Sequence, residues 1–157
     1  MEFGDLFIVQ ANDRGFQAMA TLFNEHMAKN LPGWLVCGKT FQINQLLFEN
    51  GMDPSLADWM GVIVLHQLAR KGDIELAEQF LNQGANIQAR DDDINSTPLG
   101  WAAKYGQIDM VQFLHTRGAL KVHPDEPKWA TPLEWAKRRQ HATAVAMLSK
   151  AIDQITN

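Results

Sequence analysis

Short amphipathic stretches recur along this chain, and each is too short to be stable as an isolated helix. Residues 97–105 open with Thr-Pro, where threonine caps free N–H groups and proline suits the first helical position. Gly106 then ends the helix, and a second apolar pattern begins at Ile108. Because isolated helices of this length are not stable in water, we expect each one to be stabilised by packing on a neighbour.

The pattern repeats at a fixed spacing. Thr97-Pro98-Leu99 returns as Thr131-Pro132-Leu133, and one equal step upstream the segment 63–69 keeps Leu65 and Ala69 in the same register. A second amphipathic stretch follows each first one, at 74–81, 108–114 and 144–148. Glycine at the turn between the two stretches, as in Gly72 and Gly106, accepts a positive φ without steric cost. The sequence therefore predicts helix–turn–helix units that stack and share one elongated core.

The repeat weakens towards the N-terminus. Gly33-Trp34 falls in register with Gly100-Trp101, and a second helix is expected to end at Asn50-Gly51. Residues 6–15 and 16–29 read as one more helix pair, which gives five pairs in all. We expect a single domain over 1–157, with divergent N-terminal capping units in 1–60, clear repeats in 61–150 and a C-terminal tail in 151–157.

These residues resemble the ankyrin repeat, in which Thr-Pro-Leu-His, an Ala-Ala pair and glycine precede an amphipathic helix, Gly-Ala and a long hairpin-like loop. The best match comprises Thr97-Pro98-Leu99, Ala102-Ala103, Gly106, Val111, Leu114 and Gly118-Ala119. The resemblance implies an all-α solenoid of stacked helical units, and the style of the repeats is similar to stand-alone bacterial examples.

Two departures from the family pattern carry their own expectations. The family's histidine is present only as His66, and Gly100 and Glu134 stand in its place in the later units. We expect His66 to bind a loop, and we expect the hydrogen bonds between loops to be missing at the other two positions. Gln140 stands where the last turn calls for glycine. That turn should be strained or change its shape.

Composition and charge exclude several classes of protein. The formal net charge is −4, so no general attraction to nucleic acid or to anionic membranes is implied. The longest apolar run is too short to span a bilayer, and the acidic N-terminus lacks the basic start of a secretory signal. Cys37, the single cysteine, cannot form an internal disulfide and is expected to be a small buried hydrophobe. A cytoplasmic location fits these features.

No cluster of residues indicates catalysis, a metal or a cofactor. The acidic run Asp91-Asp92-Asp93 lacks the further oxygen ligands of a calcium site and is expected to be a solvated loop tip. The histidines are scattered without zinc spacing, and there is no nucleophile elbow or phosphate loop. The basic run Lys137-Arg138-Arg139 could be a nucleic-acid patch, but a solvated outer face is favoured in a net acidic chain.

The tryptophans divide into two groups. Trp34, Trp101 and Trp135 share one register in the first helices, and we expect them in the core. Trp129 lies in a loop with two prolines and is expected either to be an exposed anchor for a partner or to fold back onto Pro127 and Trp101. Both interpretations stay open at this stage.

By resemblance, the chain is a non-enzymatic module that binds another protein through its concave face and loop tips. The alternative is an enzyme or small-molecule sensor with a cleft between the divergent N-terminal helices and the regular repeats. A monomer or a weak homodimer through an end unit is expected. The family's contact positions fall in this sequence on Trp59, Met60, Val62, Arg70, Lys71, Asp93, Ile94, Ser96, Lys104, Tyr105, Lys128, Trp129, Ala130, Lys137 and Arg138.

Overall fold

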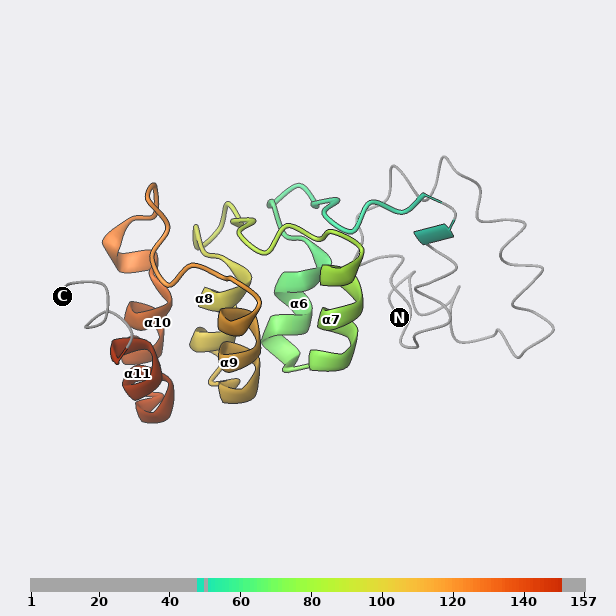
Figure 1. The fold of residues 1–157 in the computed structure, drawn as a ribbon. Coiled ribbons are helices and arrows are strands. Elements are labelled where there is room, and N and C mark those ends of the chain that lie inside the picture. The colour runs from blue at the N-terminus through green and yellow to red at the C-terminus, as the bar shows by residue number, and fades with distance from the viewer. Residues whose placement is uncertain (1–47, 50, 151–157) are drawn as a thin grey trace, which may run out of the picture.

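Three helix pairs stand side by side in the computed structural model of the protein, which describes residues 48–49 and 51–150 (Figure 1). The predicted helices upstream of residue 48 and the predicted tail at 151–157 lie outside these residues. The helices of the described part are α6 (Val64–Lys71), α7 (Ile74–Asn82), α8 (Pro98–Lys104), α9 (Ile108–Thr116), the 3₁₀ helix η1 (Lys128–Ala130), α10 (Pro132–Arg138) and α11 (Ala142–Ser149).

The helices form two layers. We call α6 with α7 the third unit, α8 with α9 the fourth unit, and α10 with α11 the fifth unit, after the five predicted pairs. The first helices α6, α8 and α10 pack extensively on one another, whereas α7, α9 and α11 contact one another much less. The first helices therefore form the inner layer of the stack. The prediction that 97–105 and 131–138 lie as neighbours in adjoining units is confirmed.

The capping residues explain where the first helices begin. Thr97 Oγ1 accepts a hydrogen bond from the N–H of Gly100, and Thr131 Oγ1 accepts one from Glu134, each at 3.3 Å. A proline follows each threonine at the first turn, as the sequence predicts. Helix α6 lacks a capping hydroxyl, and there the N–H of Ile63 donates to His66 Nδ1 at 3.2 Å.

The turns between paired helices have the left-handed conformation. Gly72 and Gly106 have φ values of +75° and +70°. Gln140 has φ +59° at the equivalent position. The last turn thus keeps the glycine shape, and a residue with a Cβ carries the strain. Of the two predicted outcomes, strain at an unchanged turn is the one observed.

Side chains from the following unit close these turns. Gln107 Nε2 donates to the carbonyl oxygen of Arg70 at 2.9 Å, and His141 Nε2 lies 3.1 Å from the carbonyl oxygen of Lys104. Both pairs occupy the same register, because 107 and 141 are one repeat apart, as are 70 and 104. A polar side chain of one unit therefore binds an unpaired carbonyl at the end of the preceding inner helix.

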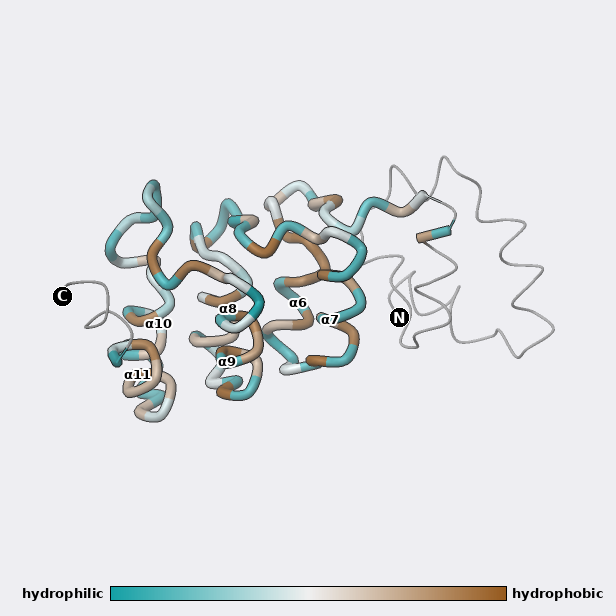
Figure 2. Tube along the Cα trace, in the orientation of Figure 1, coloured by the Kyte–Doolittle hydropathy of each residue, from teal (hydrophilic) through white to brown (hydrophobic). Residues whose placement is uncertain are grey.

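The shared core runs through all three units. It is made of aliphatic side chains and one phenylalanine that are almost fully buried, among them Leu65, Ala69, Phe80, Leu99, Ala102, Ala103, Met110, Leu114, Ala136 and Leu148. Figure 2 shows hydrophobic and hydrophilic residues alternating along the helices, as expected for helices that each bury one side. Phe48 packs edge-on against Phe80 with ring centroids 5.1 Å apart, which extends the core beyond α7.

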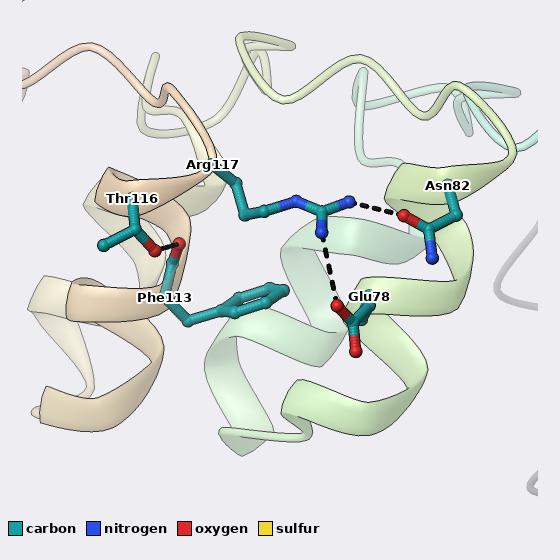
Figure 3. A network of polar contacts seen from close by, with 5 residues as sticks. All are labelled: Glu78, Asn82, Phe113, Thr116 and Arg117. Atoms are coloured by element: carbon teal, nitrogen blue, oxygen red, sulfur yellow. Dashed lines mark hydrogen bonds and ion pairs between the residues drawn. The ribbon is translucent and has the colours of Figure 1, made fainter.

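The outer layer is joined by a polar network between α7 and the end of α9 (Figure 3). The guanidinium of Arg117 donates to Glu78 Oε1 at 3.2 Å and to Asn82 Oδ1 at 2.5 Å. Its Cζ also lies 5.8 Å from the ring centroid of Phe113. The contacts of Arg117 therefore join α7 to α9, two outer helices that pack less closely than the inner ones do.

A relay of hydrogen bonds joins the loops that precede the inner helices. His66 is fully buried, and its Nε2 lies 3.2 Å from the carbonyl oxygen of Ser96. Since Nδ1 accepts a backbone N–H, Nε2 carries the proton and donates. Burial lowers the pKa of His66, which keeps the ring neutral. The predicted structural role of His66 as a loop-binding group is confirmed.

The expected loss of this bond at Gly100 is wrong, because Ser96 replaces it. The hydroxyl of Ser96 donates a hydrogen bond to the carbonyl oxygen of Ala130 at 3.3 Å. Ala130 is one repeat after Ser96, so its carbonyl takes the place that the carbonyl of Ser96 has opposite His66. A Cβ at Gly100 would lie 1.9 Å from Ser96 Oγ. The serine therefore occupies the space that a side chain at position 100 would take.

Candidate partner-binding surface

The ends of the inner helices carry basic residues in a repeating register. Arg70-Lys71, Lys104-Tyr105 and Arg138-Arg139 stand at equivalent positions of α6, α8 and α10, each pair one repeat after the last. Cations are favoured at the C-terminal end of a helix by the helix dipole. Stacking of the inner helices brings the three pairs into one row. We call these six residues the basic row.

Aromatic rings lie between the cations of this row. The Cζ atom of Arg70 is 5.1 Å from the ring centroid of Tyr105. Lys104 Nζ is 5.8 Å from the same centroid and 4.6 Å from that of Trp135. Arg138 Cζ is 5.3 Å from Trp135 and 6.0 Å from Trp129. These distances suit cation–π contacts, so the charged ends of three long side chains are held over rings of the fourth and fifth units.

The cations of the row have no acidic partner in the described part of the chain. Lys137, just beside the row, pairs with Glu134 at 2.7 Å, but Arg70, Lys104 and Arg138 form no such ion pair there. Burial lowers the pKa of Lys104, and the nearby positive charge of Arg139 lowers it further, whereas the carboxylates of Asp91 and Asp93 act in the opposite direction. The row thus brings like charges close together, with two carboxylates near its middle.

Most of the predicted contact residues reach the surface. Trp59 is 86% exposed, Trp129 45% and Tyr105 40%. Six more of the predicted contact residues are exposed: Arg70, Lys71, Asp93, Lys128, Lys137 and Arg138. Three others are half-buried: Met60, Ile94 and Lys104. These side chains are placed where a partner can touch them.

Three of the predicted contact residues are buried and cannot offer their side chains. Val62 is 4% exposed, and Ser96 and Ala130 are 0% exposed. Val62 lies just before the buried start of α6, and Ser96 and Ala130 hydrogen-bond to each other in the loop relay. The repeat register predicted that these three residues contact a partner at the surface. In the structure, local packing turns their side chains inward. We exclude these three side chains from the surface.

Trp129 combines parts of both interpretations. Its ring packs edge-on against Trp135 with centroids 6.4 Å apart, and the side chain remains 45% exposed. It folds back, as one interpretation expected, but onto Trp135 of its own unit. Trp135 is 8% exposed and Trp101 is half-buried, so Trp135 fits the predicted core position more closely.

The acidic loop before α8 is only partly a solvated tip. Asp92 and Asp93 are exposed, as expected, but Asp91 is 1% exposed. Its carboxylate accepts hydrogen bonds from the N–H groups of Ile94 at 2.8 Å and Ser96 at 3.2 Å, and from Trp101 Nε1 at 2.8 Å. Asp91 thus organises the loop that leads into the inner helix, and the description of the run as solvated is wrong for this residue.

The predicted contact residues leave out three exposed side chains. Arg139 is predicted only as part of the basic run, although it follows from Tyr105 by the same repeat step that located Arg138. Leu120 and Val122, in the loop between α9 and η1, are 45% and 53% exposed and have no signal in the repeat. In the described residues no group of three or more His, Cys, Asp or Glu side chains is placed to hold a metal ion.

The fold and the surface together define a solenoid of helical hairpins with a patterned inner face. A family model described as ankyrin repeats in three copies matches residues 34–125 and 65–157. The chain belongs to the ankyrin repeat family. Among the helices that the structure describes, none is both long and apolar enough to cross a membrane.

Curated relatives carry this repeat inside much longer proteins. The chain is 36% identical over 93 residues to the ARF GTPase-activating protein Git of Drosophila melanogaster, which is 59% of this chain and 13% of that protein. It is 37% identical over 73 residues to palmitoyltransferase ZDHHC17 of Rattus norvegicus and 38% identical to ZDHHC13 of Mus musculus, in each case 46% of this chain and 12% of the relative. The activities in these names therefore describe proteins of which this chain covers a small part.

Proposed function

We propose that this chain binds another protein through the inner face of α6, α8 and α10 and the adjoining loop tips. Ankyrin repeats are generally protein–protein interaction modules. The observation that supports this choice of face is the combination, in one row across three units, of exposed aromatic rings and cations that form no ion pair with any described residue.

The chemistry of the row suits a protein surface. Large, rigid aromatic side chains supply much of the binding energy at interfaces, and Tyr105 and Trp129 are half-exposed rings of this kind. Arginine is also enriched at such interfaces. The packed inner helices fix the backbone beneath these side chains, so little ordering is needed on binding. The role is one of binding without catalysis.

The choice of face can be tested by site-specific photo-crosslinking in a lysate of the native cell. A photoreactive residue at position 105 should form adducts with a partner protein, whereas one at Gln112, exposed on the outer helix α9, should not. The variant Trp129→Ala/Tyr105→Ala should lose recovery of that partner. Glu75→Ala/Gln112→Ala on the outer helices is the matched control, and thermal melts check that both variants fold.

Recovery of the same partner at equal strength by the Trp129→Ala/Tyr105→Ala variant would show that the face is wrong. Adducts that form only from position 112 would move the contact to the outer layer.

A further inference from the structure

We infer that the basic row takes an acidic protein segment in the extended polyproline II conformation, whose carboxylates are spaced about three residues apart. This inference rests on the proposed function and specifies the chemistry of the partner. The occupant is a stretch of polypeptide that runs across the ends of α6, α8 and α10.

Charge complementarity is the first argument. Arg70, Lys71, Lys104, Arg138 and Arg139 carry positive charge at the same two positions of three consecutive units. Within the described residues none of them forms an ion pair with a carboxylate. An incoming carboxylate would both find a partner and relieve the mutual repulsion of crowded cations.

The cations are also held in place before any partner arrives. The charged ends of Arg70, Lys104 and Arg138 lie over the rings of Tyr105, Trp135 and Trp129 at 4.6 to 6.0 Å. Free lysine and arginine side chains lose rotamer freedom when they bind an anion. Contacts with rings reduce that loss, so exposed ion pairs formed here should be stronger than ordinary surface pairs.

The spacing of the occupant follows from the stacking of the helices. Neighbouring packed helices lie about 8–10 Å apart, and a polyproline II segment advances about 3.1 Å per residue with three residues per turn. One unit of the solenoid therefore corresponds to about three residues of such a segment, and every third side chain of the segment points to the same side. A polyproline II segment with acidic residues at every third position would place one carboxylate against each cationic pair.

The arrangement favours a peptide over a nucleic acid. Bases bind to protein surfaces by stacking on aromatic faces, and cations already cover faces of Tyr105 and Trp135 in the row. Asp92 and Asp93 are exposed on the loop before α8, and Asp93 is near enough to act on Lys104. A broad polyanion would meet this negative charge, whereas a narrow peptide need not.

The test is fluorescence anisotropy with synthetic peptides and the full chain. The probe is a labelled Gly/Ser peptide with glutamate at every third position. Its comparators are an isomer with the same glutamates in one block, a glutamine version, and a single-stranded oligonucleotide of equal charge. We expect the spaced peptide to bind severalfold more tightly than the block isomer, and its affinity to fall as salt is raised.

Matched variants locate the site. Arg70→Gln/Lys104→Gln/Arg138→Gln should weaken binding by at least about tenfold. Lys150→Gln/Gln112→Glu/Thr143→Glu lowers the net charge by the same amount on exposed outer positions and should retain affinity. The swap Arg70→Lys/Lys104→Arg/Arg138→Lys keeps all charges and should also bind. Circular dichroism confirms folding of each.

Equal binding of the spaced and block peptides, equal loss in both charge-lowering variants, or tighter binding of the oligonucleotide would overturn the inference. If the peptide fails while position 105 still forms adducts with a partner, only the acidic character is wrong. If both fail, the inner face itself is wrong.

Discussion

The loops before α8 and before α10 lead into the same Thr-Pro helix start, yet they bury an acidic side chain in different ways. Asp91 is 1% exposed, and its Oδ1 accepts hydrogen bonds from two backbone N–H groups at 2.8 and 3.1 Å. Its Oδ2 accepts a hydrogen bond from Trp101 Nε1 at 2.8 Å. Glu126, 9% exposed, accepts from the N–H of His123 at 3.3 Å through Oε2 alone. Its Oε1 is buried without a hydrogen-bond partner among the described residues.

The two indoles show the same contrast. Trp101 and Trp135 occupy one register in successive units, and Trp101 donates to the acid of its own loop. Trp135 Nε1 is buried and finds no partner in the described residues. Asp91, in the loop before α8, is one position further from the capping Thr97 than Glu126, in the loop before α10, is from Thr131. Burial of an acid therefore stabilises a loop only where the register lets it meet its donors.

The largest effect should come from removing the well-bonded acid. Asp91→Ala leaves several buried donors unpaired, and we expect it to lower the free energy of unfolding by about 3 kcal/mol. Urea denaturation followed by tryptophan fluorescence measures this change. Asp92→Ala, one residue away at an exposed position, is the control and should change stability by less than about 0.5 kcal/mol. Similar losses in the two variants would show that the hydrogen bonds of Asp91 contribute little.

The bond that joins the two loops should give the next largest effect. Gly100→His places a Cβ on the hydroxyl of Ser96, and we expect a loss of about 2 kcal/mol. Ser96→Ala removes the bond to Ala130 and should cost about 1 kcal/mol. In the double variant the histidine has room and can donate to Ala130, as His66 donates to Ser96.

The double variant should therefore be more stable than Gly100→His alone. A double-mutant cycle measured by urea denaturation should give a coupling energy of at least about 1.5 kcal/mol between the two substitutions. Additive losses would mean that Ser96 does not substitute for the missing histidine.

The sequence predicted the fold well because the register of each unit is a local property that repeats. Within residues 61–150, the Thr-Pro starts, the glycine turns and the second helices lie where the pattern predicted them. At Gln140 the packing of neighbouring elements imposes φ +59° on a residue that does not favour it. The sequence therefore predicted the helices and an irregular turn at Gln140, but it did not decide between a strained turn and a turn of different shape.

The candidate surface was less predictable. Register placed Tyr105, Trp129 and Arg138 on the surface but also assigned the buried Val62, Ser96 and Ala130 to it. The role of Ser96 depends on a contact with the loop of the next unit, and that of Asp91 on the position of an indole. Such contacts arise only in the assembled stack, so a pattern within one unit does not reveal them.

The smallest expected effect concerns the poorly bonded acid and has a distinct pH signature. Burial raises the pKa of Glu126 from its ordinary value of 4.5 to about 6. Below pH 4.5 the carboxyl is protonated in the folded and unfolded chain alike, so burial of its charge costs nothing. Between pH 4.5 and about pH 6, the Glu126 carboxyl is ionised in the unfolded chain but still protonated in the folded chain. The stability that this residue contributes is therefore lost as the pH rises through about 6.

Glu126→Gln should accordingly match the parent chain near pH 4 and exceed its stability by about 1 kcal/mol at pH 7. Thermal melts of both chains from about pH 4 to about pH 7.5 measure the difference, with Asp125→Asn, at the exposed neighbouring position, as the control substitution. A difference that stays constant with pH would mean that Glu126 is ionised throughout and has found a partner for its charge. In that case the two loops would be equivalent in energy, and the contrast between Asp91 and Glu126 would be one of geometry alone.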